Sequence, residues 1–185
     1  MTQKATNFDL DFTNFFAAGS RPAAAVRQQP RNAPLLPARA ENLVRYAKAR
    51  TGAVRVSDDA PVLVLEDHEG CRRLLEKVIS LYGLPVRGTA DVREFAKALR
   101  QPPLPRLILL DVGLHHANGF QVLTHLRLHA QTSAIPVVMV TAMSASSDVI
   151  RGLSLGADGY VSKPIVVSAL RSVLDTVLQT PTASA

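Results

Sequence analysis

From Pro61 onward, short apolar runs alternate with amphipathic segments, and this alternation restricts the fold more than any other feature of the chain. The apolar runs have the length of buried strands, and the segments between them carry apolar residues at helical spacing. We expect strands at 62–66, 84–88, 106–110, 135–141 and 158–162, with helices at 69–81, 91–100, 118–129, 146–155 and 166–179. Such alternation predicts an α/β domain with a doubly wound, five-stranded parallel sheet over residues 61–180.

The first 60 residues have a different composition. Residues 17–40 are rich in Ala, Pro and Arg and carry too little apolar bulk to offset the entropy of ordering. We therefore predict a largely irregular, flexible N-terminal extension at 1–60, with short helices at 7–16 and 39–50, and a tail at 181–185.

Four of the chain's six phenylalanines fall on one face of the first of these predicted helices. The face either docks into the groove of a partner or folds back onto its own domain, and the pattern does not decide between the two. The residues concerned are Phe8, Phe12, Phe15 and Phe16.

The net charge of +6 lies mostly in the front third, where residues 12–57 hold eight Lys and Arg against Glu41 alone. Such a segment either contacts nucleic-acid phosphates or keeps a flexible region solvated. No Lys/Arg cluster is dense and no helix-turn-helix is evident, so we favour solvation and retain a nucleic-acid-binding regulator as an alternative.

Targeting signals are absent from the pattern. No apolar run approaches the roughly 20 residues of a membrane span, and the N-terminus shows no export signal. The single cysteine, Cys71, excludes an internal disulfide and suits a reducing compartment. We expect a cytoplasmic protein without a membrane span, in which Cys71 is a structural thiol.

Polar side chains end several of the predicted strands. Glu66 and Asp67 follow the first strand, Asp111 the third, Thr141 the fourth, and Lys163 the fifth. In a doubly wound sheet, sites form outside the carboxyl ends of the strands, so these side chains should meet there.

Three carboxylates in one pocket repel each other, and a divalent cation relieves that repulsion. Mg²⁺ prefers oxygen ligands, and Mn²⁺ accepts the same ones. The pocket also suits a phosphoryl group, because Lys163 and the Thr141 hydroxyl can hold its oxygens while Asp111 attacks the phosphorus. The pattern therefore predicts an aspartyl phosphate at Asp111.

With these residues identified, the chain resembles a response regulator receiver domain. The stretches "VLVLEDHEGCRRLLEKVI", "LILLDVGLHHANGFQVL", "IPVVMVTA" and "GADGYVSKPI" are similar to the family's successive motifs and cover residues 61 to about 180. The resemblance implies a flavodoxin-like (βα)5 fold in a two-component phosphorelay. It also implies a histidine kinase or phosphotransfer protein as phosphoryl donor, and a phosphoacceptor that takes part in its own phosphorylation and dephosphorylation without being a conventional enzyme.

The resemblance assigns a role to each pocket residue. Asp111 would be the phosphoacceptor, and Thr141 and Lys163 would assist it. Thr141 and Tyr160 would be the switch pair. The metal ligands would be Glu66 through water, Asp67 and Asp111, with the main-chain carbonyl of Gly113.

The loop after the nucleophile departs from the family pattern. Where a proline-containing stretch is usual, this chain has Leu114-His115-His116-Ala117-Asn118-Gly119, so the loop loses a fixed φ angle. The two histidines either tune dephosphorylation or are ordinary solvated loop residues. Gly113 stands where hydrolases with an aspartate nucleophile usually carry a second acid, which disfavours that class.

The printed sequence shows no effector domain, so the first hypothesis is a stand-alone receiver that acts through an unidentified downstream protein. Segment 166–179 is more apolar than one buried stripe requires, which indicates either a well-buried helix or a homodimer surface spanning 146–179. A pseudo-receiver that is never phosphorylated remains a further alternative.

Overall fold

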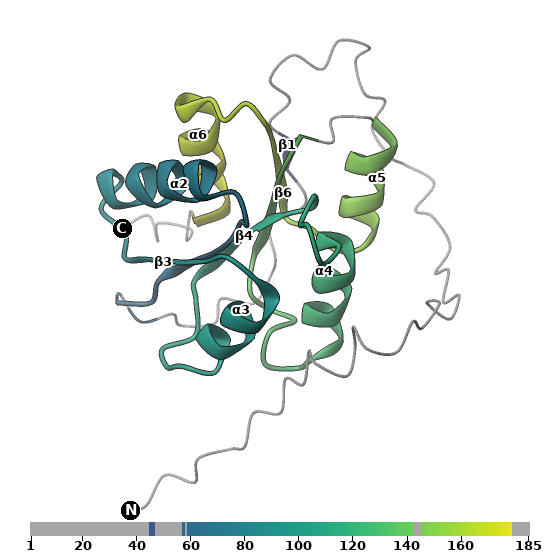
Figure 1. Cartoon of the computed structure of the whole chain (residues 1–185), viewed down its shortest axis with the longest axis horizontal. Coiled ribbons are helices and arrows are strands. Elements are labelled where there is room, and N and C mark those ends of the chain that lie inside the picture. The colour runs from purple at the N-terminus through teal and green to yellow at the C-terminus, as the bar shows by residue number, and fades with distance from the viewer. Residues whose placement is uncertain (1–44, 47–56, 58, 143–145, 179–185) are drawn as a thin grey trace, which may run out of the picture.

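The computed structural model describes residues 45–46, 57, 59–142 and 146–178, and these form one sheet with helices on both faces (Figure 1). The parallel strands are β2 (Val62–Leu65), β3 (Val86–Thr89), β4 (Leu107–Asp111), β5 (Val137–Thr141) and β6 (Gly159–Ser162). The sheet order is β1-β6-β5-β4-β2-β3, so β4 lies at its centre. The predicted doubly wound arrangement of five parallel strands is confirmed.

The helices are α2 (Glu69–Leu81), α3 (Val92–Leu99), α4 (Gly119–Leu128), α5 (Ser146–Ser154) and α6 (Val167–Leu178). Helices α2 and α6 cover one face, and α3, α4 and α5 cover the other (Figure 1). Alternate strand residues face opposite sides, so in β4 Leu107 and Leu109 pack under α2 and α6 while Ile108 and Leu110 pack on the other layer. The pattern explains why the strands are apolar throughout: both of their faces are covered.

Side-chain caps begin three of these helices. The imidazole of His68 accepts a hydrogen bond from Cys71 N–H at 3.2 Å, the Asp91 carboxylate accepts one from Glu94 N–H at 2.8 Å, and the Asn118 amide oxygen accepts one from Phe120 N–H at 2.9 Å. Each bond satisfies one of the N–H groups that lack a partner in the first turn. The cap of α2, His68, lies shortly after the end of β2, and the cap of α4, Asn118, lies at the end of the loop that follows β4. Both caps therefore help to fix the path of the chain between a strand end and the next helix.

One predicted element is wrong where it can be judged. Within the range 39–50, where we predicted a helix, Arg45–Tyr46 forms a two-residue strand, β1, antiparallel to β6. The free edge of β6 presents unpaired backbone groups, and two extended residues satisfy them where a helix could not. The predicted helix at 7–16, with Phe8, Phe12, Phe15 and Phe16, lies outside the described residues.

Helix α6 divides its apolar residues between core and surface. Leu170, Val173 and Leu174 are buried, and Val177 and Leu178 are half-buried. Val167 is exposed at the start of the helix, as is Val166 just before it. Most of its apolar excess is therefore core. No described helix is long and apolar enough to cross a membrane.

Candidate phosphorylation pocket

The predicted strand-end residues lie together. Glu66 and Asp67 follow β2, Asp111 ends β4, and oxygens of these three carboxylates lie within 4.8 Å of one another. Thr141 ends β5 next to β4, and Lys163 follows β6. The parallel register aligns the carboxyl ends of neighbouring strands, which is why residues up to 97 positions apart in the chain share one pocket.

Lys163 neutralises part of this negative charge. Its ammonium lies 2.7 Å from Glu66 Oε2 and donates a hydrogen bond to Asp111 Oδ2 at 2.9 Å. Burial would lower the pKa of Lys163, but the contacts with both carboxylates outweigh it and raise that pKa. The lysine is therefore a fixed positive charge that links Glu66, which directly follows β2, to Asp111 at the end of β4.

Glu66 is the most deeply buried carboxylate of the pocket, with 1 % of its area exposed. Burial raises its pKa; the Lys163 contact opposes this rise, and the nearby charge of Asp111 adds to it. Its Oε1 accepts a long hydrogen bond, 3.3 Å, from His68 N–H. The pocket therefore holds more negative charge than Lys163 alone offsets, as expected for a cation site.

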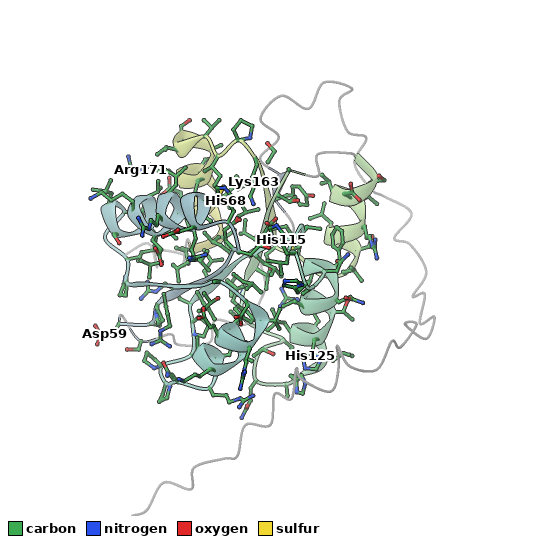
Figure 2. All side chains as sticks on the ribbon, viewed as in Figure 1. Asp59, His68, His115, His125, Lys163 and Arg171 are labelled. Atoms are coloured by element: carbon green, nitrogen blue, oxygen red, sulfur yellow. The ribbon has the colours of Figure 1, made fainter. Side chains whose placement is uncertain are left out.

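Asp67 is held by the loop that follows β4. Its Oδ2 accepts hydrogen bonds from the backbone N–H of His115 at 2.6 Å and contacts the His115 ring nitrogen Nδ1 at 2.5 Å. Burial opposes the change, but these bonds lower the pKa of Asp67 and keep it ionised. Figure 2 shows His115 on the same edge of the sheet as Lys163.

This role of His115 is one that sequence reasoning did not resolve. The departure from the family pattern marked His115 and His116 together, and the structure separates them: His115 bonds to Asp67, whereas the His116 ring is exposed and lies 6.5 Å from the His115 ring. The sequence carried the signal, but only the loop conformation shows which ring reaches the pocket.

Two glycines border Asp111 for different reasons. Gly113 N–H donates to Asp111 Oδ1 at 3.1 Å, and a Cβ at Gly113 would meet nothing closer than 3.9 Å. A Cβ at Gly119 would lie 2.1 Å from the backbone oxygen of Asp111, so only glycine lets α4 start this close to β4. Gly119 therefore sets the position of Asp111, whereas Gly113 leaves access to it open.

The predicted switch pair is buried. Thr141 ends β5, and Tyr160 in β6 is 1 % exposed and packs into the core beside α4 and α5. Burial, together with the charges of Asp148 and then Asp111, raises the pKa of Tyr160. In this structure the tyrosine therefore occupies an inward position.

The stability that Glu66 contributes should fall as the pH rises. Its folded-state pKa lies above the ordinary 4.5, so the folded protein binds this proton more tightly than the unfolded chain. The contribution is complete below pH 4.5 and is lost as the pH rises through the raised pKa. We expect urea unfolding in EDTA to show wild type losing stability relative to Glu66→Gln as the pH rises above 4.5. Parallel pH profiles for the two proteins would contradict this.

We also expect His115→Ala to bind Mg²⁺ several-fold more tightly than wild type. The ring nitrogen of His115 occupies Asp67 Oδ2, an oxygen that a cation would need, and an exposed hydrogen bond of this kind is worth about 1 kcal/mol, or roughly fivefold in affinity. Titration of the Asp67 and Gly113 amide signals with MgCl2 measures the change. His116→Ala is the matched control and should match wild type; weaker binding by His115→Ala would show that the ring orients Asp67 for the cation instead.

The structure thus combines a flavodoxin-like sheet with a strand-end pocket that holds an acidic pair, a central aspartate and a lysine. Residues 62–175 match the model of the response regulator receiver domain, and the chain belongs to this family. It is thus a receiver domain of two-component response regulators.

Curated relatives agree with this assignment over the same region. The chain is 35% identical over 117 residues to the phosphate regulon transcriptional regulatory protein PhoB of Escherichia coli. This alignment covers 61% of this chain and 51% of PhoB. It is 36% identical over 103 residues to the transcriptional regulatory protein GltR of Pseudomonas aeruginosa, covering 56% of this chain and 42% of GltR. The aligned region spans about half the length of these relatives.

Solved structures show the same fold. The chemotaxis protein CheY4 of Vibrio cholerae superposes with a TM-score of 0.58 at 28% identity, covering 64% of this chain and 98% of CheY4. A response regulator from Chloroflexus aurantiacus gives the same TM-score, identity and coverage. The region shared with both is the sheet and helices described above.

Proposed function

We propose that this protein is a phosphorylation-activated response regulator in which Asp111 accepts a phosphoryl group from a histidine kinase or a phosphotransfer protein. One observation supports this most strongly: Lys163 contacts both Asp111 and Glu66, while Asp67 completes a compact group of carboxylate oxygens. A structural aspartate at a strand end requires none of these neighbours.

The donor set fits a hard divalent cation. All three carboxylates offer oxygen, which Mg²⁺ and Mn²⁺ accept, and one lysine, Lys163, stands against three carboxylates in the pocket. Glu66, Asp67, Asp111 and the main-chain carbonyl of Gly113 would hold the ion. When bound, it supplies Lewis-acid neutralisation of the phosphoryl oxygens.

The residues of the chain itself perform the transfer. A carboxylate oxygen of Asp111 attacks the phosphorus, an oxygen–phosphorus bond forms, and the phosphorus–nitrogen bond of the donor breaks with its electron pair returning to the imidazole. Lys163 remains beside Asp111 and balances charge on a phosphoryl oxygen. Gly113 N–H already donates to the other side of the nucleophile and keeps its carboxylate oriented.

Phosphorylation would then act on Thr141 and Tyr160. The Thr141 hydroxyl donates to a phosphoryl oxygen, and this movement stabilises Tyr160 in its inward position. In the chain, β6, which carries Tyr160, follows α5 and precedes α6. A change at Tyr160 would therefore alter the surface formed by residues 146–179. Ile150, Val166 and Val167 are exposed apolar residues in this region and suit a homodimer or protein partner.

The proposed output is regulation through protein contacts in the cytoplasm. PhoB and GltR are named as transcriptional regulators, and the region they share with this chain is the receiver domain. A direct contact with nucleic acid would fall to the basic front segment, which lies mostly outside the described residues. Loss of binding on deletion of residues 17–57 would test that alternative.

Intact-mass spectrometry after incubation with acetyl phosphate tests the proposal. We expect one phosphoryl adduct with Mg²⁺ and none in EDTA, because the cation is needed to offset the charge of the pocket. No adduct on a folded protein in Mg²⁺ would overturn the proposal and identify a pseudo-receiver that acts as a constitutive interaction module.

A further inference from the structure

Helix α4 carries a second group of metal-ligating atoms at the end remote from the pocket. His125 and His129 are one helical turn apart, and their Nε2 atoms face each other at 3.1 Å with ring centroids 4.5 Å apart. Figure 2 shows His125 far from Lys163, at the opposite end of the molecule. Neither the phosphoryl transfer nor the switch uses these two residues.

The distance between the two nitrogens suits a shared metal ion. Imidazole nitrogens bind first-row divalent metals at about 2.0–2.1 Å, so two of them lie about 2.9 Å apart at a right angle and about 3.3 Å apart at a tetrahedral angle. The observed 3.1 Å falls between these values. Little side-chain movement is therefore needed to bring both nitrogens into one coordination shell.

The backbone already holds the pair in place. His129 is the C-cap of α4, with ψ 125°, and its carbonyl accepts hydrogen bonds from Thr132 N–H at 3.1 Å and Ser133 N–H at 2.8 Å. The buried Thr132 hydroxyl donates to Leu126 O at 2.8 Å and ties this turn to the helix. A preformed turn lowers the ordering cost of binding.

We propose that His125 and His129 form a binding site for a divalent transition-metal ion of the nickel, copper and zinc group. Two histidines at i and i+4 on a helix are a spacing that zinc sites use, and imidazole suits these metals better than it suits Mg²⁺. The protein supplies two nitrogen ligands, and water or a further ligand fills the remaining positions.

The protonation states are consistent with this assignment. Burial, with a smaller effect of His129, lowers the pKa of His125 and favours the neutral ring that ligates metals. In the metal-free protein the two Nε2 atoms share one hydrogen bond, so one of them carries the proton. Binding of a metal ion to both Nε2 atoms requires this proton to leave its Nε2 atom, which makes the affinity depend on pH.

Calorimetric titration of the full-length protein with NiCl2, in saturating MgCl2 to occupy the carboxylate pocket, tests the site. We expect one Ni²⁺ to bind wild type, and His125→Gln and His129→Gln to bind it about tenfold or more weakly. His116→Gln, whose ring is exposed and makes no contact with the carboxylate pocket among the described interactions, is the matched control and should bind like wild type. Equal binding by all three variants would overturn the proposal.

Further measurements show whether weaker Ni²⁺ binding by a variant reflects the loss of a metal ligand or a loss of folding. Paramagnetic Ni²⁺ should broaden the amide signals of residues 121–133, and it should raise the melting temperature of wild type but not that of either site variant. Broadening centred on residues 66–67 and 111 would place the ion in the carboxylate pocket and would refute the histidine site. Circular dichroism of the metal-free variants checks that α4 is retained.

Discussion

The Asp111→Asn variant is expected to form no detectable phosphoryl adduct under conditions in which wild type is modified. An amide oxygen carries no charge to share with phosphorus and is a poor nucleophile, so the step is lost rather than slowed. The substitution keeps the size of the side chain, its place at the end of β4 and an acceptor for Lys163 or Gly113 N–H. Intact-mass spectrometry in acetyl phosphate and Mg²⁺ measures the result.

A matched control comes from the other end of the neighbouring strand. Asp59 is exposed and precedes β2, whereas the pocket follows it, so Asp59→Asn should be modified like wild type (Figure 2). Persistent modification of Asp111→Asn would place the acceptor elsewhere, with Asp67 the first carboxylate to examine. Loss of modification in both variants would point to a general effect of charge instead.

The second large effect is on stability. Asp158→Ala is expected to lower the free energy of unfolding by about 3–5 kcal/mol, the range for breaking a buried ion pair. Asp158 Oδ2 accepts from Arg127 at 2.9 Å and from the backbone N–H of Val137 at 2.8 Å, and both charged side chains are nearly buried. Removal of the carboxylate leaves a guanidinium and the first N–H of β5 poorly satisfied. Urea unfolding at neutral pH measures the loss.

Two variants separate the charge from the backbone bond. Asp158→Asn keeps an acceptor for Val137 N–H and should lose less than Asp158→Ala. Arg127→Met removes the cation together with its bonds to the Gly156 and Ile135 carbonyls. The double variant Arg127→Met/Asp158→Asn should be more stable than the sum of the single losses predicts, because neither charge is then left unpaired. Simple additivity would show that the ion pair itself contributes little.

Most of the fold could be predicted from the sequence because its strands are unambiguous. Runs such as Leu107–Leu110 are apolar throughout, and only a strand covered on both faces explains them. Once the strands are parallel, their carboxyl ends must share an edge, and Asp111 and Lys163 meet there whatever the loops do. The structure places both residues in that pocket.

The remaining features depend on conformations that residue order does not specify. The composition of residues 39–50 favours a helix, but a free sheet edge stabilises Arg45–Tyr46 as a strand. The loop conformation decides that His115 rather than His116 reaches Asp67. The spacing of His125 and His129 is visible in the sequence, yet the facing nitrogens follow from ring rotamers and from the turn at His129.

The position of the pocket within the sheet bears on how the molecule opens locally. The three carboxylates lie at the ends of β2 and β4, two interior strands of the sheet, whose amide hydrogens should exchange late with solvent. Lys163 follows β6, which pairs with β5 on one side and, among the described residues, with just the two residues of β1 on the other. Partial opening at that edge would withdraw the ammonium while the carboxylates stay together. Fraying of β6 therefore leaves the three carboxylates without the Lys163 charge, and their repulsion opposes it. The exchange rate of the β6 amide hydrogens should therefore depend on the charge held in the pocket.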